Sequence, residues 1–224
     1  MLRPEQRVKL DATNDLDFYD SPRLVTHVDE GFIDHLTNLY QGELSSDTRI
    51  LDLMSSWVSH LPETMEFAHV EGHGMNEGEL AKNPRLDHYF VQDLNHNPQL
   101  PLANADFDAV LITVSIQYLQ YPEAVLAEIY RVLKPNGIVI ISFSNRMFYQ
   151  KAIAAWRDGT DTERVNLVRQ YFQSVDGFTT PQVVVHQTPV AGFLQMLGLA
   201  GGDPFYAVMA RKIEFGISNL KTKN

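Results

Sequence analysis

The chain has 224 residues, of which 44% are hydrophobic and 21% are charged, values typical of a soluble globular protein with a single buried core. Its 28 Asp and Glu outnumber 18 Lys and Arg, and because the resulting charge of −10 repels phosphate backbones, we expect no nucleic-acid partner. There is no cysteine, which excludes disulfides, thiolate catalysis and Cys-ligated zinc.

The first part of the chain is predicted to be an arm followed by a helix. Residues 1–24 are charged and lack an apolar secretory stretch, and no apolar run elsewhere reaches membrane-spanning length, so we expect a cytoplasmic protein without a membrane partner. Apolar residues recur at helical spacing from Leu24 to Tyr40, which predicts a helix that ends at Gly42. We expect residues 1–48 to cover the binding site of a core formed by residues 49–224.

From Arg49 onward, short apolar strands alternate with amphipathic helices. Strands are predicted at residues 50–53, 67–73, 89–91, 107–114, 138–143, 183–185 and 205–210. Helices are predicted at residues 76–83, 122–133, 147–175 with a break near residue 159, and 193–197. Asn76 with Glu79 three residues later has the pattern of a capping box. This alternation predicts an α/β protein with a parallel sheet.

In such a sheet, ligands bind beyond the carboxyl ends of the strands. Polar residues that follow the predicted strands are therefore the first site candidates. They are Asp52, Ser55, Ser56, Asn76, Asp93, Thr113, Ser115, Gln117, Asn145 and Arg146.

One segment carries a family resemblance. Phe107-Asp108-Ala109-Val110, then Pro122, then Arg131-Val132-Leu133-Lys134-Pro135-Asn136-Gly137 resembles the fourth-strand to fifth-strand segment of class I S-adenosylmethionine-dependent methyltransferases, in the small-molecule (type 11) branch. Only one position departs from that family's Arg-Val-Leu-Lys-Pro-Gly-Gly ending, and the resemblance extends over residues 49–212. It implies a Rossmann-like sheet of seven strands in the order 3-2-1-4-5-7-6, with strand 7 antiparallel and helices on both faces. It also implies S-adenosylmethionine as cofactor and a small-molecule acceptor.

Two family motifs are altered. In the pattern acid-x-Gly-x-Gly-x-Gly the acid is Asp52, but Met54, Ser56 and Val58 replace the glycines. We expect Val58 to be the least favourable replacement, because a β-branched residue tolerates positive φ poorly. The family's second strand ends in an acid that binds both ribose hydroxyls, and Gly74 occupies that position here. The cofactor is therefore expected to bind, but more weakly than to a glycine-rich loop.

The resemblance implies roles for particular residues. Asp52 would receive the methionine ammonium and Asp93 would contact the adenine; each could instead hold its own loop. Asn76 would reach a ribose hydroxyl or only cap its helix, and Trp57 would flank the cofactor or close the core. The expected cofactor-binding set is Asp52, Ser55, Ser56, Trp57, Asn76, Asp93, Leu94 and Thr113. The expected acceptor-binding set is Tyr19, Gln117, Tyr118 and Arg146.

Other chemistries receive little support. His69, Glu71 and His73 alternate on one strand face, as metal ligands could, but no fourth ligand follows at a suitable spacing, so we predict no metal site. No catalytic triad or phosphate loop is present, and no catalytic residue is assigned.

Three functions remain in view. The first is methyl transfer to a small molecule, which mainly requires orientation of the nucleophile. The second is a methyltransferase-fold protein that binds a ligand or partner without catalysis. The third is a nicotinamide-dependent oxidoreductase, whose glycine fingerprint is missing.

Overall fold

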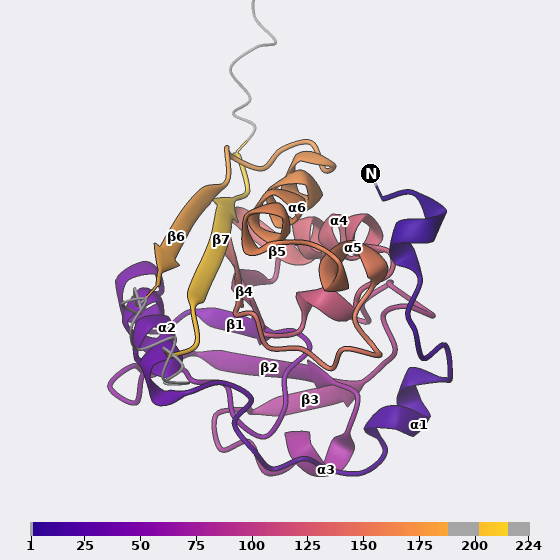
Figure 1. Ribbon diagram of the computed structural model, residues 1–224. Coiled ribbons are helices and arrows are strands. Elements are labelled where there is room, and N and C mark those ends of the chain that lie inside the picture. The colour runs from indigo at the N-terminus through magenta and orange to yellow at the C-terminus, as the bar shows by residue number, and fades with distance from the viewer. Residues whose placement is uncertain (1, 188–201, 215–224) are drawn as a thin grey trace, which may run out of the picture.

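The computed structural model describes residues 2–187 and 202–214, and these form one seven-stranded sheet in the order β3-β2-β1-β4-β5-β7-β6 (Figure 1). The strands are β1 (Arg49–Asp52), β2 (His69–Gly74), β3 (His88–Val91), β4 (Phe107–Thr113), β5 (Leu133–Phe143), β6 (Gln182–His186) and β7 (Phe205–Arg211). β7 pairs antiparallel with both β5 and β6, whereas the pairs among β1 to β5 are parallel. The predicted strand order and the reversed last strand are confirmed.

The helices cover both faces of this sheet. They are α1 (Asp15–Tyr19), α2 (Glu30–Glu43), α3 (Glu77–Leu80), α4 (Pro122–Val132), α5 (Ala154–Arg157) and α6 (Asp161–Gln173), with 3-10 turns η1 (Pro4–Arg7) and η2 (Ile116–Tyr118). Among the described residues, none of these helices has the length and apolarity needed to cross a membrane.

Side chains that alternate along the central strands build two separate cores. Val139 and Ile141 of β5 belong to one core, which also contains apolar residues of α4, α5 and α6. Ile138 and Ile140 of the same strand belong to the other core, together with residues of α2. This alternation explains why the second half of β5 is apolar except for Ser142, since it is buried on both faces.

The helix α2 begins later than the sequence pattern suggested. The predicted start at Leu24 is wrong: the helix begins at Glu30, because Asp29 caps it by accepting a hydrogen bond from the Phe32 amide at 2.9 Å. The helix also continues through Gly42 to Glu43. Its buried residues pack against the sheet face, so it is the preceding segment, and not α2, that reaches the mouth of the site.

The strand boundaries follow the predictions closely except at β5, whereas two helices are shorter than predicted: α3 spans only Glu77–Leu80, and the helix expected from residue 147 begins at Ala154. The strand was expected at residues 138–143, but β5 begins at Leu133. Leu133 pairs with Phe107 and Ile138 with Ala109, so residues 134–137 loop out of the ladder, with Asn136 at φ 64°. The expected break between α5 and α6 is present, and the expected helix at 193–197 lies outside the described residues.

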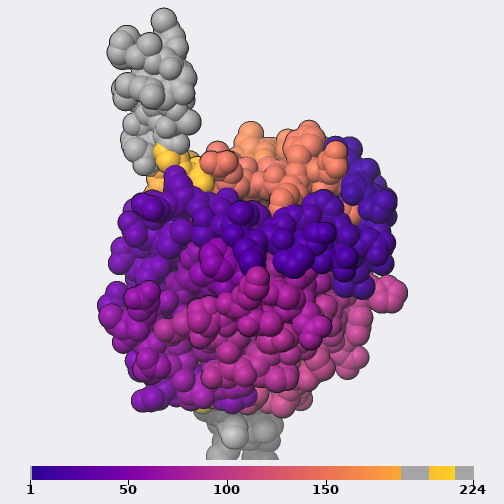
Figure 2. Space-filling view, turned by 90° about the horizontal axis from the view of Figure 1, so that it is seen from below, coloured from indigo at the N-terminus to yellow at the C-terminus, as the bar shows by residue number. Residues whose placement is uncertain are grey.

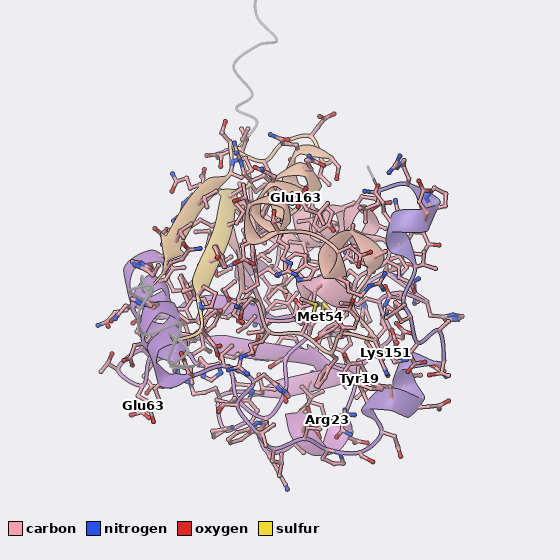
Figure 3. All side chains as sticks on the ribbon, viewed as in Figure 1. Tyr19, Arg23, Met54, Glu63, Lys151 and Glu163 are labelled. Atoms are coloured by element: carbon pink, nitrogen blue, oxygen red, sulfur yellow. The ribbon has the colours of Figure 1, made fainter. Side chains whose placement is uncertain are left out.

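The N-terminal arm crosses the face of the molecule shown in Figure 2, where its residues form a continuous band between later parts of the chain. A buried ion cluster anchors it. The Lys151 ammonium is fully buried, 3.2 Å from carboxylate oxygens of both Asp11 and Asp15, and it donates to the carbonyl of Thr13 at 2.9 Å. Lys9 pairs with Asp15 as well. Figure 3 shows Lys151 on the same side of the molecule as Tyr19 and Arg23 of the arm.

Candidate functional site

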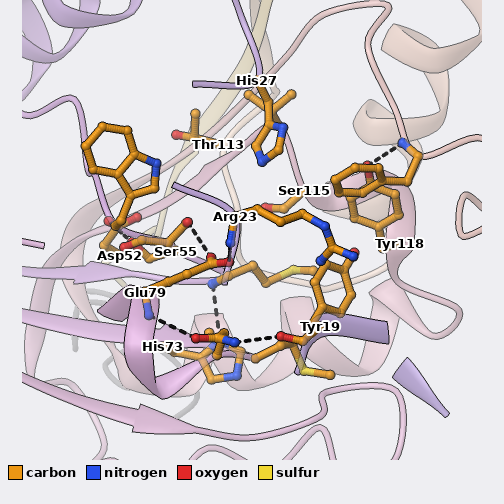
Figure 4. A pocket seen from close by; sticks show the side chains of 18 of the residues that line it. Tyr19, Arg23, His27, Asp52, Ser55, His73, Glu79, Thr113, Ser115 and Tyr118 are labelled. Atoms are coloured by element: carbon orange, nitrogen blue, oxygen red, sulfur yellow. Dashed lines mark hydrogen bonds between the residues drawn. The ribbon is translucent and has the colours of Figure 1, made fainter. Parts of the chain in front are cut away.

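A cavity of about 330 Å³ lies at the carboxyl ends of β1 to β4, beneath the arm (Figure 4). Its size falls in the range of small-molecule sites, and its position is the one expected for an open parallel sheet. Residues that line it come from the loops after β1, β2, β3 and β4, from the arm, and from the segment after β5.

The loop after β1 adopts the left-handed conformation at only one of the three positions where the family has glycine. Met54 has φ 59°, whereas Ser56 and Val58 are absent from the described non-glycine residues with positive φ. The expectation that Val58 would be the worst replacement is therefore wrong, because the backbone there does not require glycine. Strain of about 1–3 kcal/mol at Met54 must be offset by its surroundings.

His73 holds this loop against its neighbours. Its Nδ1 accepts the Met54 amide at 3.1 Å, and its Nε2 lies 2.9 Å from the carbonyl of Gln92, which fixes the proton on Nε2. Burial lowers the pKa of His73 to about 4, so the ring is neutral. One side chain thus ties the loops after β1 and β3 to the end of β2.

Asp52 is the most perturbed carboxyl group of the cavity. Only 3% of the residue is exposed, and burial raises its pKa to about 6, against hydrogen bonds from Ser55 and Ser59 that lower it. The Ser55 hydroxyl donates to it at 2.5 Å. Within the described part of the chain, no Lys, Arg or His lies within 4.0 Å of this carboxylate. A buried carboxylate of this kind is suited to a cationic ligand group.

The end of β2 has no room for the acid that the family carries there. A Cβ at Gly74 would lie 2.6 Å from the carbonyl oxygen of Ser55, so glycine is required by this close approach. Asn76 caps α3 by accepting the Glu79 amide at 2.9 Å, and its Nδ2 donates to the carbonyls of Tyr19 and Asp20. The Asn76 amide group is thus used in holding the arm and the helix.

Glu79 brings a carboxylate into the cavity from α3. One oxygen accepts the Ser56 hydroxyl at 2.6 Å, and the other accepts the Arg23 backbone amide, also at 2.6 Å. The sequence pattern identified Glu79 only as a capping residue. Its side chain instead joins the loop after β1 to the arm.

The loops after β3 and β4 contribute the remaining predicted cofactor residues. Asp93 lines the cavity and accepts the Asn95 amide at 2.8 Å, so it also holds its own loop, while Leu94 is buried at its wall. Thr113 lines the cavity beside the hydroxyl of Tyr40 at 2.9 Å. Val114 adopts φ 51° and His60 φ 52°, so with Met54 three described positions in the cavity wall are strained.

Trp57 also lines the cavity, and its ring nitrogen donates to the carbonyl of Val25 in the arm at 3.2 Å. Of the predicted acceptor residues, Tyr19, Tyr118 and Arg146 line the cavity, but Gln117 does not. The turn η2 directs the Gln117 side chain away, where its Nε2 donates to the carbonyl of Val114 at 2.8 Å.

The hydroxyl of Tyr118 accepts the Phe148 amide at 2.8 Å, and burial raises the pKa of both Tyr118 and Tyr19. Burial also lowers the pKa of His27 and His60, which line the same cavity. Both imidazoles are therefore neutral near neutral pH.

The histidines of β2 do not form a metal centre. Glu71 is 2.9 Å from His69 and 2.6 Å from His88, and His73 points instead to the loop after β1. No group of three potential ligands with suitable geometry occurs among residues 2–187 and 202–214.

A family model described as "Methyltransferase domain" matches residues 66–141, the stretch from β2 to β5. The sheet has that family's strand order and its reversed last strand. The described part of the chain therefore has the class I methyltransferase fold. The resemblance read from its fourth-strand to fifth-strand segment is thereby confirmed.

One curated relative is a malonyl-[acyl-carrier protein] O-methyltransferase of Laribacter hongkongensis (strain HLHK9), 35% identical over 81 residues. The match covers 36% of this chain and 22% of that relative, so the chain spans only about a fifth of the relative's length.

Solved structures share the fold over most of the chain. An S-adenosylmethionine-dependent methyltransferase from Archaeoglobus fulgidus has a TM-score of 0.53 at 14% identity, covering 82% of this chain and 95% of its own. The [4+2]-cyclase SpnF has a TM-score of 0.54 at 18% identity, covering 80% and 81%. Phosphoethanolamine N-methyltransferase 2 of Haemonchus contortus, in complex with S-adenosylmethionine, has a TM-score of 0.53 at 15% identity, covering 79% and 53%. Because one of these proteins is a cyclase, the fold by itself does not determine the reaction.

Proposed function

We propose that this protein transfers the methyl group of S-adenosylmethionine, the methyl donor of its family, to a small-molecule acceptor. The observation that carries the proposal is Asp52, a buried carboxylate without a cationic partner among the described residues, placed in a cavity at the carboxyl edge of the sheet. A positively charged ligand group beside it would compensate the charge that burial leaves unsatisfied.

The residues of the cavity fit this cofactor. Asp52 would accept the methionine ammonium, the Ser55 and Ser56 turn would lie along the amino-acid part, and Asp93 with Leu94 would hold the adenine. Trp57 and Thr113 complete the proposed cofactor set, since both line the same cavity.

The ribose is the part whose recognition must differ from the family pattern. Gly74 cannot carry an acid, and the Asn76 amide is already bound to Tyr19 and Asp20. Glu79 is the carboxylate in the cavity that is nearest to Ser56 of the altered loop, at 2.6 Å. We therefore place the ribose hydroxyls beside Glu79, whose oxygens each retain a second lone pair to accept with.

The bound cofactor would supply a sulfonium-activated methyl carbon for in-line attack by the acceptor. The chain's own residues have the task of orientation and of excluding water, which is the larger part of catalysis in such a transfer. The arm would contribute to both, because its Tyr19 lines the cavity, Trp57 of the loop after β1 donates to its Val25 carbonyl, and Lys151 anchors it to the core. His27 or His60 is neutral and can take the proton that a protonated nucleophile releases.

The acceptor would lie on the side of the cavity lined by Tyr19, Tyr118 and Arg146. This side lies between the arm and the segment after β5. We place no acceptor contact at Gln117, because its side chain lies outside the lining.

Titration with S-adenosylhomocysteine, followed by heat and by thermal shift, tests the proposal. Binding should be measurable in wild-type protein and lost in Asp93→Ala. Glu71→Gln is the matched control, because Glu71 is buried among His69 and His88 and does not line the cavity. No heat and no thermal shift with wild-type protein at millimolar ligand would overturn the proposal and favour a methyltransferase-fold protein that does not catalyse methyl transfer.

A further inference from the structure

Arg23 places a guanidinium in the cavity without a carboxylate partner. Its Nη2 donates to the carbonyl of Phe18 at 2.9 Å, but its Nη1 is buried and has no hydrogen-bond partner among residues 2–187 and 202–214. Within the described ranges, no Asp or Glu lies within 4.0 Å of this side chain. A buried donor left unpaired on a charged group costs free energy, so it points to a ligand atom that completes it.

The contrast with the other arginine of the cavity is informative. Arg146 is paired with Asp203 at 2.7 Å and is 63% exposed. In a chain with 28 acidic and 18 basic residues, a carboxylate partner for an arginine is readily available. Arg23 nevertheless lies in the cavity without one in the described part of the chain.

Aromatic rings hold the Arg23 guanidinium in place. Its Cζ is 4.5 Å from the ring centre of Phe18, 5.3 Å from that of Phe148 and 5.7 Å from that of Tyr19. The ring of Tyr118 stacks on Phe148 at 6.0 Å. Figure 4 shows the guanidinium beside Tyr19 and Tyr118. These contacts fix the direction of Nη1 and provide flat, apolar walls next to it.

Nearby carboxylates do not neutralise this group. Asp15 is paired with Lys9 and Lys151, and the Glu79 oxygens accept the Ser56 hydroxyl and the Arg23 backbone amide. Asp52 has its own proposed partner, the cofactor ammonium. The histidine on this side, His27, is neutral because burial lowers its pKa.

We propose that Arg23 binds the carboxylate of a ligand through Nη1, and that this ligand is an acceptor with a flat apolar body beside its carboxylate. That the ligand is a methyl acceptor rests on the proposed function, but the anion site itself does not. The methionine carboxylate of the cofactor has the same chemistry, so the experiment must separate these two sources.

The probes are benzoate, which is anionic and flat, and benzamide, which has the same shape without the charge. Binding of each is measured by saturation-transfer NMR and calorimetry, with and without saturating S-adenosylhomocysteine. Arg23→Gln removes the charge. Arg85→Gln is the matched control. Arg85 also donates a hydrogen bond to a backbone carbonyl, that of Met65 at 2.7 Å, and its guanidinium lies over the ring of Phe67. Unlike Arg23, it does not line the cavity.

Benzoate should bind wild-type and Arg85→Gln protein equally and bind Arg23→Gln at least roughly tenfold more weakly, the loss expected for a charge-assisted hydrogen bond. Benzamide should bind wild-type and Arg23→Gln with the same low affinity. Equal binding of benzoate to Arg23→Gln and wild type, in proteins with matching thermal unfolding, would overturn the anion site.

A second set of titrations identifies the source of the carboxylate. S-adenosylhomocysteine and 5′-methylthioadenosine, which lacks the amino-acid part, are titrated into wild-type and Arg23→Gln protein. If Arg23→Gln changes the affinity of neither adenosyl ligand while it weakens benzoate, the acceptor assignment is supported. If it weakens S-adenosylhomocysteine alone, the carboxylate belongs to the cofactor and the acceptor assignment is overturned. Absence of adenosyl-ligand binding in wild-type protein would refute the proposed function. The benzoate titrations would still show whether Arg23 forms an anion site.

Discussion

Replacing Asp52 by Asn should make the protein more stable and its ligand binding weaker. Burial raises the pKa of Asp52 from 3.8 to about 6, so the folded state binds this proton more tightly than the unfolded state does. Well below pH 3.8 the carboxyl group is neutral in both states and its burial costs nothing. As the pH rises through about 6 the ionised group must be kept buried, and stability is lost.

The magnitude follows from the shift of about two pKa units, each equal to about 1.4 kcal/mol. Because Asp52 is only 3% exposed, solvent screening reduces this free-energy cost only slightly. An asparagine side chain has the same size, stays neutral, and can hydrogen-bond to the hydroxyls of Ser55 and Ser59. Asp52→Asn should therefore gain about 3 kcal/mol at about pH 7.5 and only about 1 kcal/mol at about pH 4.5.

Urea unfolding of both proteins at the two pH values measures this difference. His73 also titrates in this range, but it is present in both proteins, so its contribution cancels. In parallel, Asp52→Asn should weaken S-adenosylhomocysteine at least roughly tenfold and leave 5′-methylthioadenosine unchanged, because only the first has an ammonium. A stability difference that does not depend on pH, or equal weakening of both ligands, would refute the reasoning.

Three further changes test other parts of the site. Gly74→Asp should not restore the family's ribose acid. It should lower the free energy of unfolding in urea by about 1–3 kcal/mol and weaken S-adenosylhomocysteine binding, because its Cβ would meet the Ser55 carbonyl. The control Gly42→Ala in α2, with open space around it, should be neutral or stabilising. His73→Leu should cost about 2–4 kcal/mol near neutral pH by leaving the Met54 amide and the Gln92 carbonyl unpaired. That loss should shrink as the pH falls from about 6.5 to 4, since the neutral ring is stabilising only above its folded pKa of about 4; a His73 NMR signal that titrates near pH 6.5 would contradict this. Lys151→Met should lower the free energy of unfolding by about 3–5 kcal/mol and expose the arm to proteolysis, because Asp11 and Asp15 lose a fully buried partner. The control Arg3→Gln, in the exposed Arg3–Glu5 pair, should change little. Equal protease resistance of the two variants would refute the anchoring role.

The strands and their order were predictable from the sequence because burial dictates their composition. β4 and the second half of β5 are nearly continuous apolar runs, which is the composition expected in the middle of a parallel sheet. The polar residues after these strands were also found, since their position depends on chain connectivity alone. The start of α2 was missed because apolar periodicity outweighed Asp29, a capping residue that the sequence does show.

The site residues that were missed or underrated depend on contacts distant in sequence. Arg23 became a candidate only when the fold brought Phe18 and Phe148 around it, and Glu79 only when the arm placed the Arg23 amide beside it. Gln117 showed the opposite: it follows β4 as expected, but a single 3-10 turn points its side chain away from the cavity. Direction of a side chain in a short turn is set by packing, which composition and spacing do not encode.

The two departures from the family motifs are one structural change. Met54 replaces a glycine that gave the loop after β1 its freedom, and the loop is fixed instead by His73, whose ring and carbonyl bind the Met54 and Ser55 amides. This brings the Ser55 carbonyl against Gly74, where it occupies the space of any side chain. A loop anchored on β2 in this way excludes an acid at the end of β2. The carboxylate then has to come from elsewhere, and Glu79 reaches the same loop through the Ser56 hydroxyl.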